Sequence, residues 1–245
     1  MAITTTHAAV SEPGRRFPAN EDRWLADPDL GLYLVADGMA DVRAAEMIVQ
    51  QLPAMLKDCS ESPQTWSDPK IMEGVRQAMM GLSVEIRNKA RSNADEPEMG
   101  ATMVLALLRP NQALIGHLGT SRAYLWRDGF LEQLTRDQSV VQRYLALGVL
   151  KPEQLSNFPL GGGPTGYMGM TGEPTPAVRM VPLFPGDQLL LTSPGFTQAV
   201  SDWQMHDLLN LPKSLADTSQ RLGEAAKQAG ARDSATVLMV AVSET

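Results

Sequence analysis

The chain has 245 residues, of which 43% are hydrophobic and 20% are charged, and its formal net charge at pH 7 is −7. This length and composition are typical of a globular protein that buries a sizeable core, and the negative charge argues against nucleic acid or an anionic membrane as the main partner. The single cysteine, Cys59, excludes an internal disulfide and fits a reducing compartment. No apolar run approaches the roughly 20 residues that span a bilayer, and no signal-peptide pattern opens the chain. We therefore expect one soluble, cytoplasmic domain over residues 1–245.

The N-terminal part of the chain predicts three strands and then two long helices. These elements are expected at residues 2–10, 22–26, 32–36, 42–58 and 68–90. Pro53 lies within the first helical pattern and is expected to end or kink that helix. Two successive amphipathic helices favour an antiparallel pair that packs on a sheet.

From Gly100 onward, the pattern changes to short strands with fewer helices. Residues 103–108 are continuously apolar, which is typical of a strand buried on both faces. Ser193-Pro194-Gly195 predicts a turn, and the Gly- and Pro-rich residues 156–176 predict a mobile surface segment. Separate runs of strands and helices indicate a mixed α+β fold rather than alternating β–α units. The other expected strands are 113–118, 123–126, 130–134, 177–182, 188–193 and 236–242, and the expected helices are 139–147, 203–210 and 213–229.

Acidic residues lie where several of these strands begin or end. The apolar run from Leu32 to Ala36 ends in Asp37, and Glu21, Asp22, Asp137 and Asp233 also lie at strand ends. Each acid taken alone has the simpler interpretation of a solvated turn residue. Together they favour a site for Mg²⁺ or Mn²⁺, because these ions prefer carboxylate oxygens as ligands.

The order of these motifs resembles that of the metal-dependent protein phosphatases, the PPM or type 2C serine/threonine phosphatases, in their compact bacterial form. Seven motifs match this family nearly from end to end, at the family's spacing. They are Asn20-Glu21-Asp22, Val35–Met39, Met99–Thr102, Gly119–Tyr124, Leu131–Asp137, Gly186–Gly195 and Arg232–Val237. The resemblance implies a four-layer α-β-β-α sandwich, in which two antiparallel β-sheets are flanked by pairs of antiparallel helices.

The resemblance also implies a two-metal centre at one end of the sandwich, where a water is activated for attack on phosphorus. By position in the family's motifs, Asp37 would bridge both ions. Glu21 and the carbonyl of Gly38 would hold one ion. Asp233 and a second aspartate would hold the other.

Four positions at which the family carries its chemistry hold other residues in this chain. Pro194 replaces the second aspartate, and proline offers neither a carboxylate nor an N–H group. Thr120 and Gln198 replace two acids that serve an additional metal in bacterial members. Phe17 replaces the phosphate-binding arginine. Arg16 is adjacent and could swing in, and Arg15 is also near, but a shift of one residue matters because a bidentate guanidinium contact depends on orientation.

Three carboxylates therefore remain, those of Glu21, Asp37 and Asp233, and we expect at most one firmly bound Mg²⁺ or Mn²⁺, or none. The preferred hypothesis is a pseudophosphatase with impaired or no catalysis that binds a protein partner, phosphorylated or itself a kinase, in a bacterial signalling pathway. The alternative is an active but atypical Mg/Mn-dependent serine/threonine phosphatase with Asp37 and Arg16 as its catalytic residues. A third hypothesis is a structural or scaffold domain that binds no ligand at the position of the family's active-site cleft.

Overall fold

The computed structural model describes residues 3–17, 19–39, 41–60, 68–92, 99–151, 153–154 and 163–244. None of the helices in these ranges is both long and apolar enough to cross a membrane. The strands are β1 (Ile3–Glu12), β2 (Asp22–Asp27), β3 (Leu32–Met39), β4 (Gly100–Arg109), β5 (Gln112–Leu118), β6 (Arg122–Arg127), β7 (Phe130–Gln133), β8 (Ala177–Pro182), β9 (Gln188–Thr192) and β10 (Ala235–Glu244). The helices are α1 (Arg43–Ser60), α2 (Asp68–Arg91), α3 (Val140–Ala146), α4 (Pro194–Ala199), α5 (Asp202–Leu209) and α6 (Leu215–Gln228).

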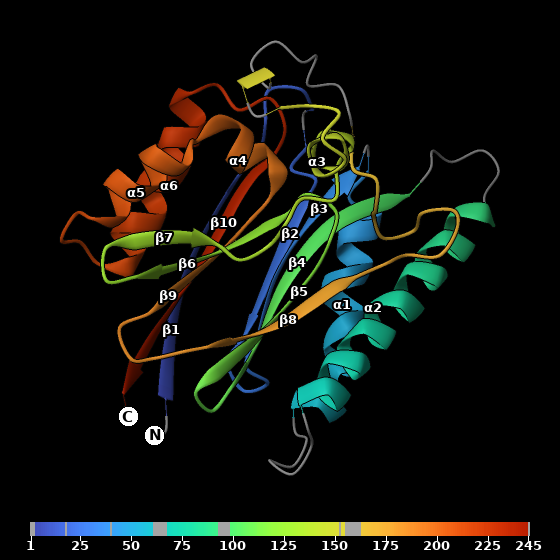
Figure 1. The fold of residues 1–245 in the computed structure, drawn as a ribbon, viewed down its shortest axis with the longest axis horizontal. Coiled ribbons are helices and arrows are strands. Elements are labelled where there is room, and N and C mark those ends of the chain that lie inside the picture. Colours follow the sequence, from blue (N-terminus) through green and yellow to red (C-terminus); the bar gives the residue numbers. More distant parts are fainter. Residues whose placement is uncertain are drawn as a thin grey trace.

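The strands form two five-stranded antiparallel sheets that pack face to face (Figure 1). One sheet has the order β2-β3-β4-β5-β8, and the other has the order β1-β10-β9-β6-β7. The first and last strands of the chain pair along their whole length, with Glu12 opposite Ala235. As a result, the segment just before β10 lies beside the loop that leads from β1 into β2.

Three apolar layers hold the sandwich together and confirm the expected four-layer architecture. The strand β4 contributes to two of them, because successive side chains of a strand point to opposite faces. Met103 and Leu105 pack in the cluster that contains α1 and α2, whereas Val104 and Ala106 pack between the two sheets. A third cluster joins the other sheet to α4, α5 and α6.

Two local expectations differ from the structure, the end of a helix at Pro53 and the turn at Ser193-Pro194-Gly195, and a third, the mobile segment, is tested only in part. The helix α1 does not end at Pro53 but continues to Ser60. The expected turn at Ser193-Pro194-Gly195 is the start of α4, because proline suits the first position of a helix, where its missing N–H would have no intrahelical partner. Of the segment expected to be mobile, residues 156–162 lie outside the described residues. Its described part is anchored by Met168, which is fully buried and exchanges two backbone hydrogen bonds with Ala101.

Candidate metal centre

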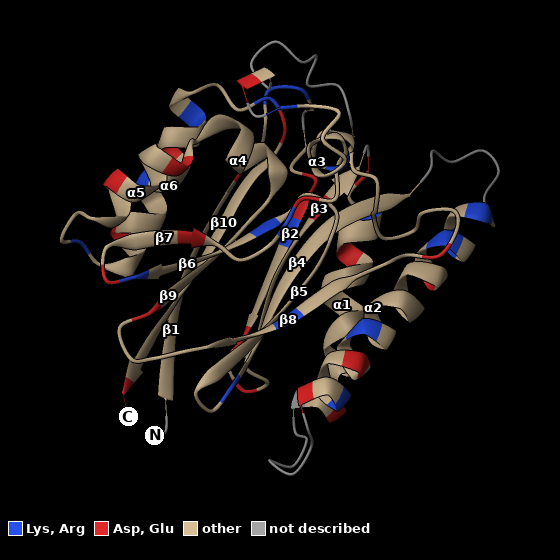
Figure 2. Cartoon of the chain, viewed as in Figure 1, with Lys and Arg blue, Asp and Glu red and all other residues tan. Residues whose placement is uncertain are grey.

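Backbone pairing brings the predicted acids to one end of the sandwich. In the hairpin of β2 and β3, Asp22 lies directly opposite Asp37. The amide of Gly38 donates to the carbonyl of Glu21 at 3.2 Å, and the amide of Glu21 donates to Oγ of Ser234 at 3.0 Å. Figure 2 shows acidic residues where β2 begins and β3 ends. The contact between Glu21 and Ser234 joins segments that are 213 positions apart in the chain.

The carboxyl groups are close enough to change one another's protonation. Burial raises the pKa of Asp22 to about 6, although hydrogen bonds from Asp37 and from Thr236, at 2.6 Å, act in the opposite direction. Burial and the neighbouring charge of Asp22 raise the pKa of Asp37 well above its ordinary value, and Asp233 and Glu21 add to this effect. The pKa of Glu21 is raised by burial and then by Asp233 and Asp22. We call Glu21, Asp22, Asp37 and Asp233 the acid cluster.

The donors in the acid cluster fit a hard divalent cation in charge and in kind. Within the described part of the chain, Oδ1 of Asp22 and Oδ1 of Asp233 are buried without a hydrogen-bond partner. Oδ1 of Asp233 lies 3.6 Å from Nη1 of Arg16 in an ion pair, so Oδ1 of Asp22 is the oxygen left for a ligand. Among the same residues, no group of three or more Asp, Glu, His or Cys side chains is arranged so that it could hold a metal ion. The ligand roles of Glu21, Asp37, Gly38 and Asp233 therefore stay predictions.

Two features of the cluster extend the sequence-based picture. Asp22 is a fourth carboxylate that the predicted ligand set left out, although its place opposite Asp37 in the expected hairpin was a signal for it. A Cβ atom on Gly38 would lie 2.3 Å from the carbonyl oxygen of Asp41. Only glycine therefore allows the end of β3 to lie this close to the backbone of Asp41. Its carbonyl remains a candidate ligand.

Arg16 lies at the edge of the acid cluster. Its Nη1 is 3.6 Å from Oδ1 of Asp233, and its guanidinium lies 4.9 Å from the centre of the Phe17 ring. The backbone amide of Arg16 donates to the carbonyl of Arg232 at 2.8 Å, which fixes the segment beside Asp233. The side chain is 58% exposed, so its donors can reach an incoming anion.

Pro194 is buried next to the segment that carries Asp233, and its side chain offers no oxygen or nitrogen ligand to a cation. The Oγ1 of Thr197 donates to its carbonyl at 3.3 Å. A Cβ atom on the following residue, Gly195, would lie 2.1 Å from the carbonyl oxygen of Ser234, so the start of α4 is in close backbone contact with the segment before β10. Gln198 is exposed on α4.

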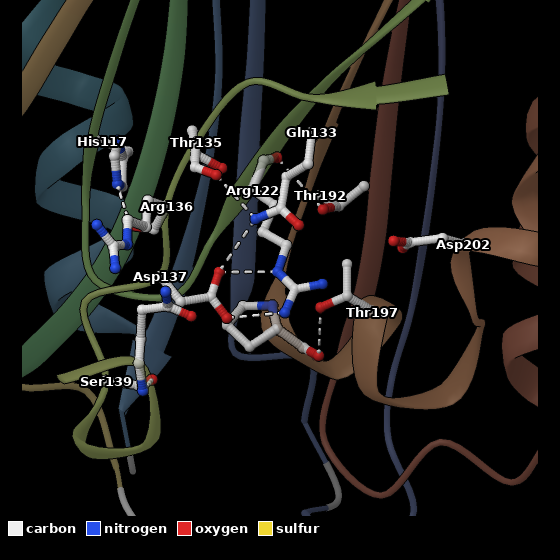
Figure 3. A network of polar contacts seen from close by, with 12 residues as sticks. His117, Arg122, Gln133, Thr135, Arg136, Asp137, Ser139, Thr192, Thr197 and Asp202 are labelled. Atoms are coloured by element: carbon white, nitrogen blue, oxygen red, sulfur yellow. Dashed lines mark hydrogen bonds and ion pairs between the residues drawn. The ribbon is translucent and has the colours of Figure 1, made fainter. Parts of the chain in front are cut away.

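Asp137 does not join the acid cluster as the sequence pattern suggested. Its two oxygens accept hydrogen bonds from Nε and Nη2 of Arg122 at 2.8 and 2.7 Å (Figure 3). The same guanidinium donates to the hydroxyl of Tyr124, which in turn donates to Asp202. The carboxylate of Asp137 is thus neutralised by a partly buried ion pair, and this pair connects β6 to the loop after β7.

The arrangement has the parts for chemistry on a phosphate ester. When bound, Mg²⁺ or Mn²⁺ acts as a Lewis acid and lowers the pKa of a coordinated water. Carboxylates of the acid cluster would hold the ion, and Arg16 would donate hydrogen bonds to phosphate oxygens. Phe17, half-buried beside Arg16, has no polar group for this task.

Comparison with known proteins shows which family this chain resembles in sequence and fold. The family model for protein phosphatase 2C matches residues 15–143. The chain is 32% identical to the protein phosphatase PhpP of Streptococcus pneumoniae, over 87% of this chain and 86% of PhpP. It is 30% identical to the serine/threonine phosphatase Stp of Listeria welshimeri, over 85% of this chain and 83% of Stp. The crystal structure of the catalytic domain of the phosphatase PstP with two manganese ions aligns with a TM-score of 0.79 and 30% identity, covering 99% of this chain and all of that one. The chain therefore belongs to the protein phosphatase 2C family, the metal-dependent (PPM) protein phosphatases.

Proposed function

We propose that this chain is a pseudophosphatase, which binds a phosphorylated serine or threonine of a protein partner but hydrolyses the phosphate ester slowly or not at all. The observation that carries the proposal is Pro194, which occupies the position of a metal-binding aspartate in the family's motif. Its ring carries no carboxylate and supplies no ligand to a cation.

The charge of the site supports the proposal. A pair of divalent ions brings four positive charges, and the predicted ligand carboxylates of Glu21, Asp37 and Asp233 offset three of them. We infer that one ion binds at most. Since metal ions supply several kcal/mol of transition-state stabilisation, the loss of one ion is expected to lower the rate by orders of magnitude.

A second candidate function is a slow but genuine Mg/Mn-dependent serine/threonine phosphatase. Two observations favour it. Asp22 brings a fourth carboxylate with a buried, unpartnered Oδ1 within the described residues. Arg16 lies 3.6 Å from Asp233, where its guanidinium can bind phosphate in place of the arginine that Phe17 replaces.

We further propose that the partner is a phosphorylated protein or a kinase in a bacterial, cytoplasmic signalling circuit. The support is the similarity to PhpP and Stp, which are named as phosphatases of bacteria. The negative net charge of −7 supports a protein partner rather than nucleic acid or an anionic membrane.

The test compares the natural chain with a variant in which the missing groups are restored: Phe17→Arg, Thr120→Asp, Pro194→Asp and Gln198→Asp. Hydrolysis of a phosphothreonine peptide is measured with Mn²⁺, and Mn²⁺ affinity is measured by calorimetry. We expect the natural chain to bind the peptide, and we expect the restored variant to hydrolyse it at least about 100-fold faster, because the second ion is regained.

Pro194→Ala is the matched control, since it removes the ring without adding a carboxylate, and it should raise neither Mn²⁺ affinity nor activity. Rapid hydrolysis by the natural chain would overturn the pseudophosphatase proposal in favour of the second candidate. Unchanged Mn²⁺ affinity in the restored variant would show that the four substituted positions do not correspond to the family's metal-binding positions.

A further inference from the structure

A cavity of about 270 Å³ lies beside α3 and is separate from the acid cluster. Figure 1 shows α3 at the end of the sandwich at which β3 ends, which is also the end of the acid cluster. The cavity is smaller than the roughly 300–1,000 Å³ of typical small-molecule sites, and its size suits one polar side chain. The lining residues that bear on its chemistry are Arg136, Asp137, Ser139, Gln142, Arg143 and Thr165.

The charge of this cavity is positive. Both oxygens of Asp137 are taken by Arg122, so the one acid in the lining is already neutralised. With the Gln142 amide turned so that its oxygen accepts, Nε and Nη2 of Arg136 donate to it at 2.8 and 3.1 Å. Over the described residues, no Asp or Glu forms an ion pair with Arg136 or Arg143. Arg136 is thus held by a neutral amide and keeps its full charge for a ligand.

The backbone that carries Arg136 is also held in place. The carbonyl of Arg136 accepts a hydrogen bond from Nε2 of His117 at 2.9 Å, and burial lowers the pKa of His117, which favours the neutral ring. Two residues further along the same loop, Oε1 of Gln138 accepts a hydrogen bond from the amide of Gly119 at 3.0 Å. Nε2 of Gln138 donates to the carbonyl of Thr175 at 3.0 Å. A site fixed in this way binds an anion without first having to order its own donors.

The link through Gly119 also relates the cavity to the acid cluster. Gly119 opens the turn between β5 and β6, and Ser121 in that turn shares a 2.8 Å hydrogen bond with Thr102. Thr102 lies opposite Asp37 in the pairing of β3 with β4. Side-chain hydrogen bonds of Gln138 and Ser121, together with the pairing of β3 and β4, therefore link the cavity lining to the strand that carries Asp37.

We propose that the cavity binds a second anionic group of the partner protein, a carboxylate or phosphate on a residue near the phosphorylated serine or threonine. This inference rests on the proposed function, because it assigns to the acid cluster the first phosphate of the same segment. The two arginines provide the charge-assisted hydrogen bonds, and the hydroxyls of Ser139 and Thr165 provide neutral ones.

The test uses the full chain with Mn²⁺ and peptides that carry a non-hydrolysable phosphonate analogue of phosphothreonine. Alanine, glutamate or phosphoserine is placed at successive positions on either side, and Kd is measured by fluorescence anisotropy. At one position we expect glutamate or phosphoserine to lower Kd about tenfold relative to alanine. The variant R136Q/R143Q should abolish this difference and leave the Kd of the alanine peptide unchanged. Whether glutamate or phosphoserine binds more tightly tells which anion the cavity prefers.

The matched control is R221Q/K227Q on α6, which also removes two positive charges, but from exposed positions outside the cavity lining. This control should keep the preference for the acidic peptide over the alanine peptide. Retention of the preference in R136Q/R143Q, or its loss in the control, would overturn the proposal. If the alanine peptide binds but no acidic peptide binds more tightly, the cavity proposal alone fails. If no peptide binds, the proposed function fails with it.

Discussion

Asp22 is an acid whose protonation depends on the fold. It is 2% exposed and lies opposite Asp37, so its charged form loses the solvation that it has in an unfolded chain. Burial raises its pKa from 3.8 to about 6. The folded state therefore holds a proton on Asp22 at pH values at which the unfolded chain has released it, and without a cation this carboxylate lowers stability at neutral pH.

We expect the metal-free protein to lose stability as the pH rises from about 4 to about 6, the interval between the two pKa values of Asp22. Asp22→Asn should remove up to about 3 kcal/mol of this loss, because the amide does not ionise and can still accept the hydrogen bond from Thr236. Urea unfolding in EDTA across this interval is the measurement.

The control for this prediction is Glu224→Gln, which removes an exposed acid on α6 and should leave the pH dependence of stability unchanged. If Asp22→Asn loses as much stability between about pH 4 and about pH 6 as the natural chain, the loss does not come from ionisation of Asp22.

At the scale of elements, the ion pair between Arg122 and Asp137 ties β6 to the loop that lines the cavity beside α3. The two side chains are 25% and 18% exposed, and their two hydrogen bonds are both shorter than 3 Å. Removing one partner of such a pair leaves the other charge partly buried and unmatched, which is more costly than removing both.

We predict that Asp137→Ala lowers the free energy of unfolding by roughly 3 kcal/mol. The double variant with Arg122→Met should be less destabilised than the sum of the two single variants. Chemical denaturation of the four proteins in a double-mutant cycle measures this coupling. Strictly additive effects would mean that the pair contributes nothing to the attachment of the loop.

At the scale of the whole molecule, the acid cluster draws its members from the β2–β3 hairpin and from the turn before β10. A cation bound between these segments would stabilise the closed sandwich, since it binds the folded chain and has no preformed site in the unfolded one. The same cation would relieve the mutual repulsion that, after burial, raises the pKa of Asp37 and Glu21.

Mn²⁺ at about 100 times its dissociation constant should therefore stabilise the fold by about 2.7 kcal/mol, which is a rise in Tm of about 5–10 °C for a chain of this size. Differential scanning calorimetry with Mn²⁺ and with EDTA measures the shift. Asp37→Asn should abolish most of it, whereas Asp217→Asn on α6 should not. A shift that persists in Asp37→Asn would place the ion elsewhere.

Much of the fold could be predicted from the sequence because periodicity and turn residues act locally. The continuous apolar run 103–108 identified a strand buried on both faces, and the spacing of Ile71, Val75 and Ala78 identified α2. Local signals were ambiguous where one residue type serves two structures. Pro194 suits both a turn and the first position of a helix, and Pro53 is carried inside α1, whose apolar face packs in the core.

The candidate site could be predicted only in part. By itself, the sequence determined the identity of the missing groups, since no packing can give Pro194 a carboxylate. Only the tertiary structure decided which acids share a site, because that depends on strand register and on contacts between distant segments. Register placed Asp22 against Asp37, whereas an equally plausible acid, Asp137, was taken by Arg122. A carboxylate's chemistry is set by the charges and solvent around it, and these exist only once the chain has folded.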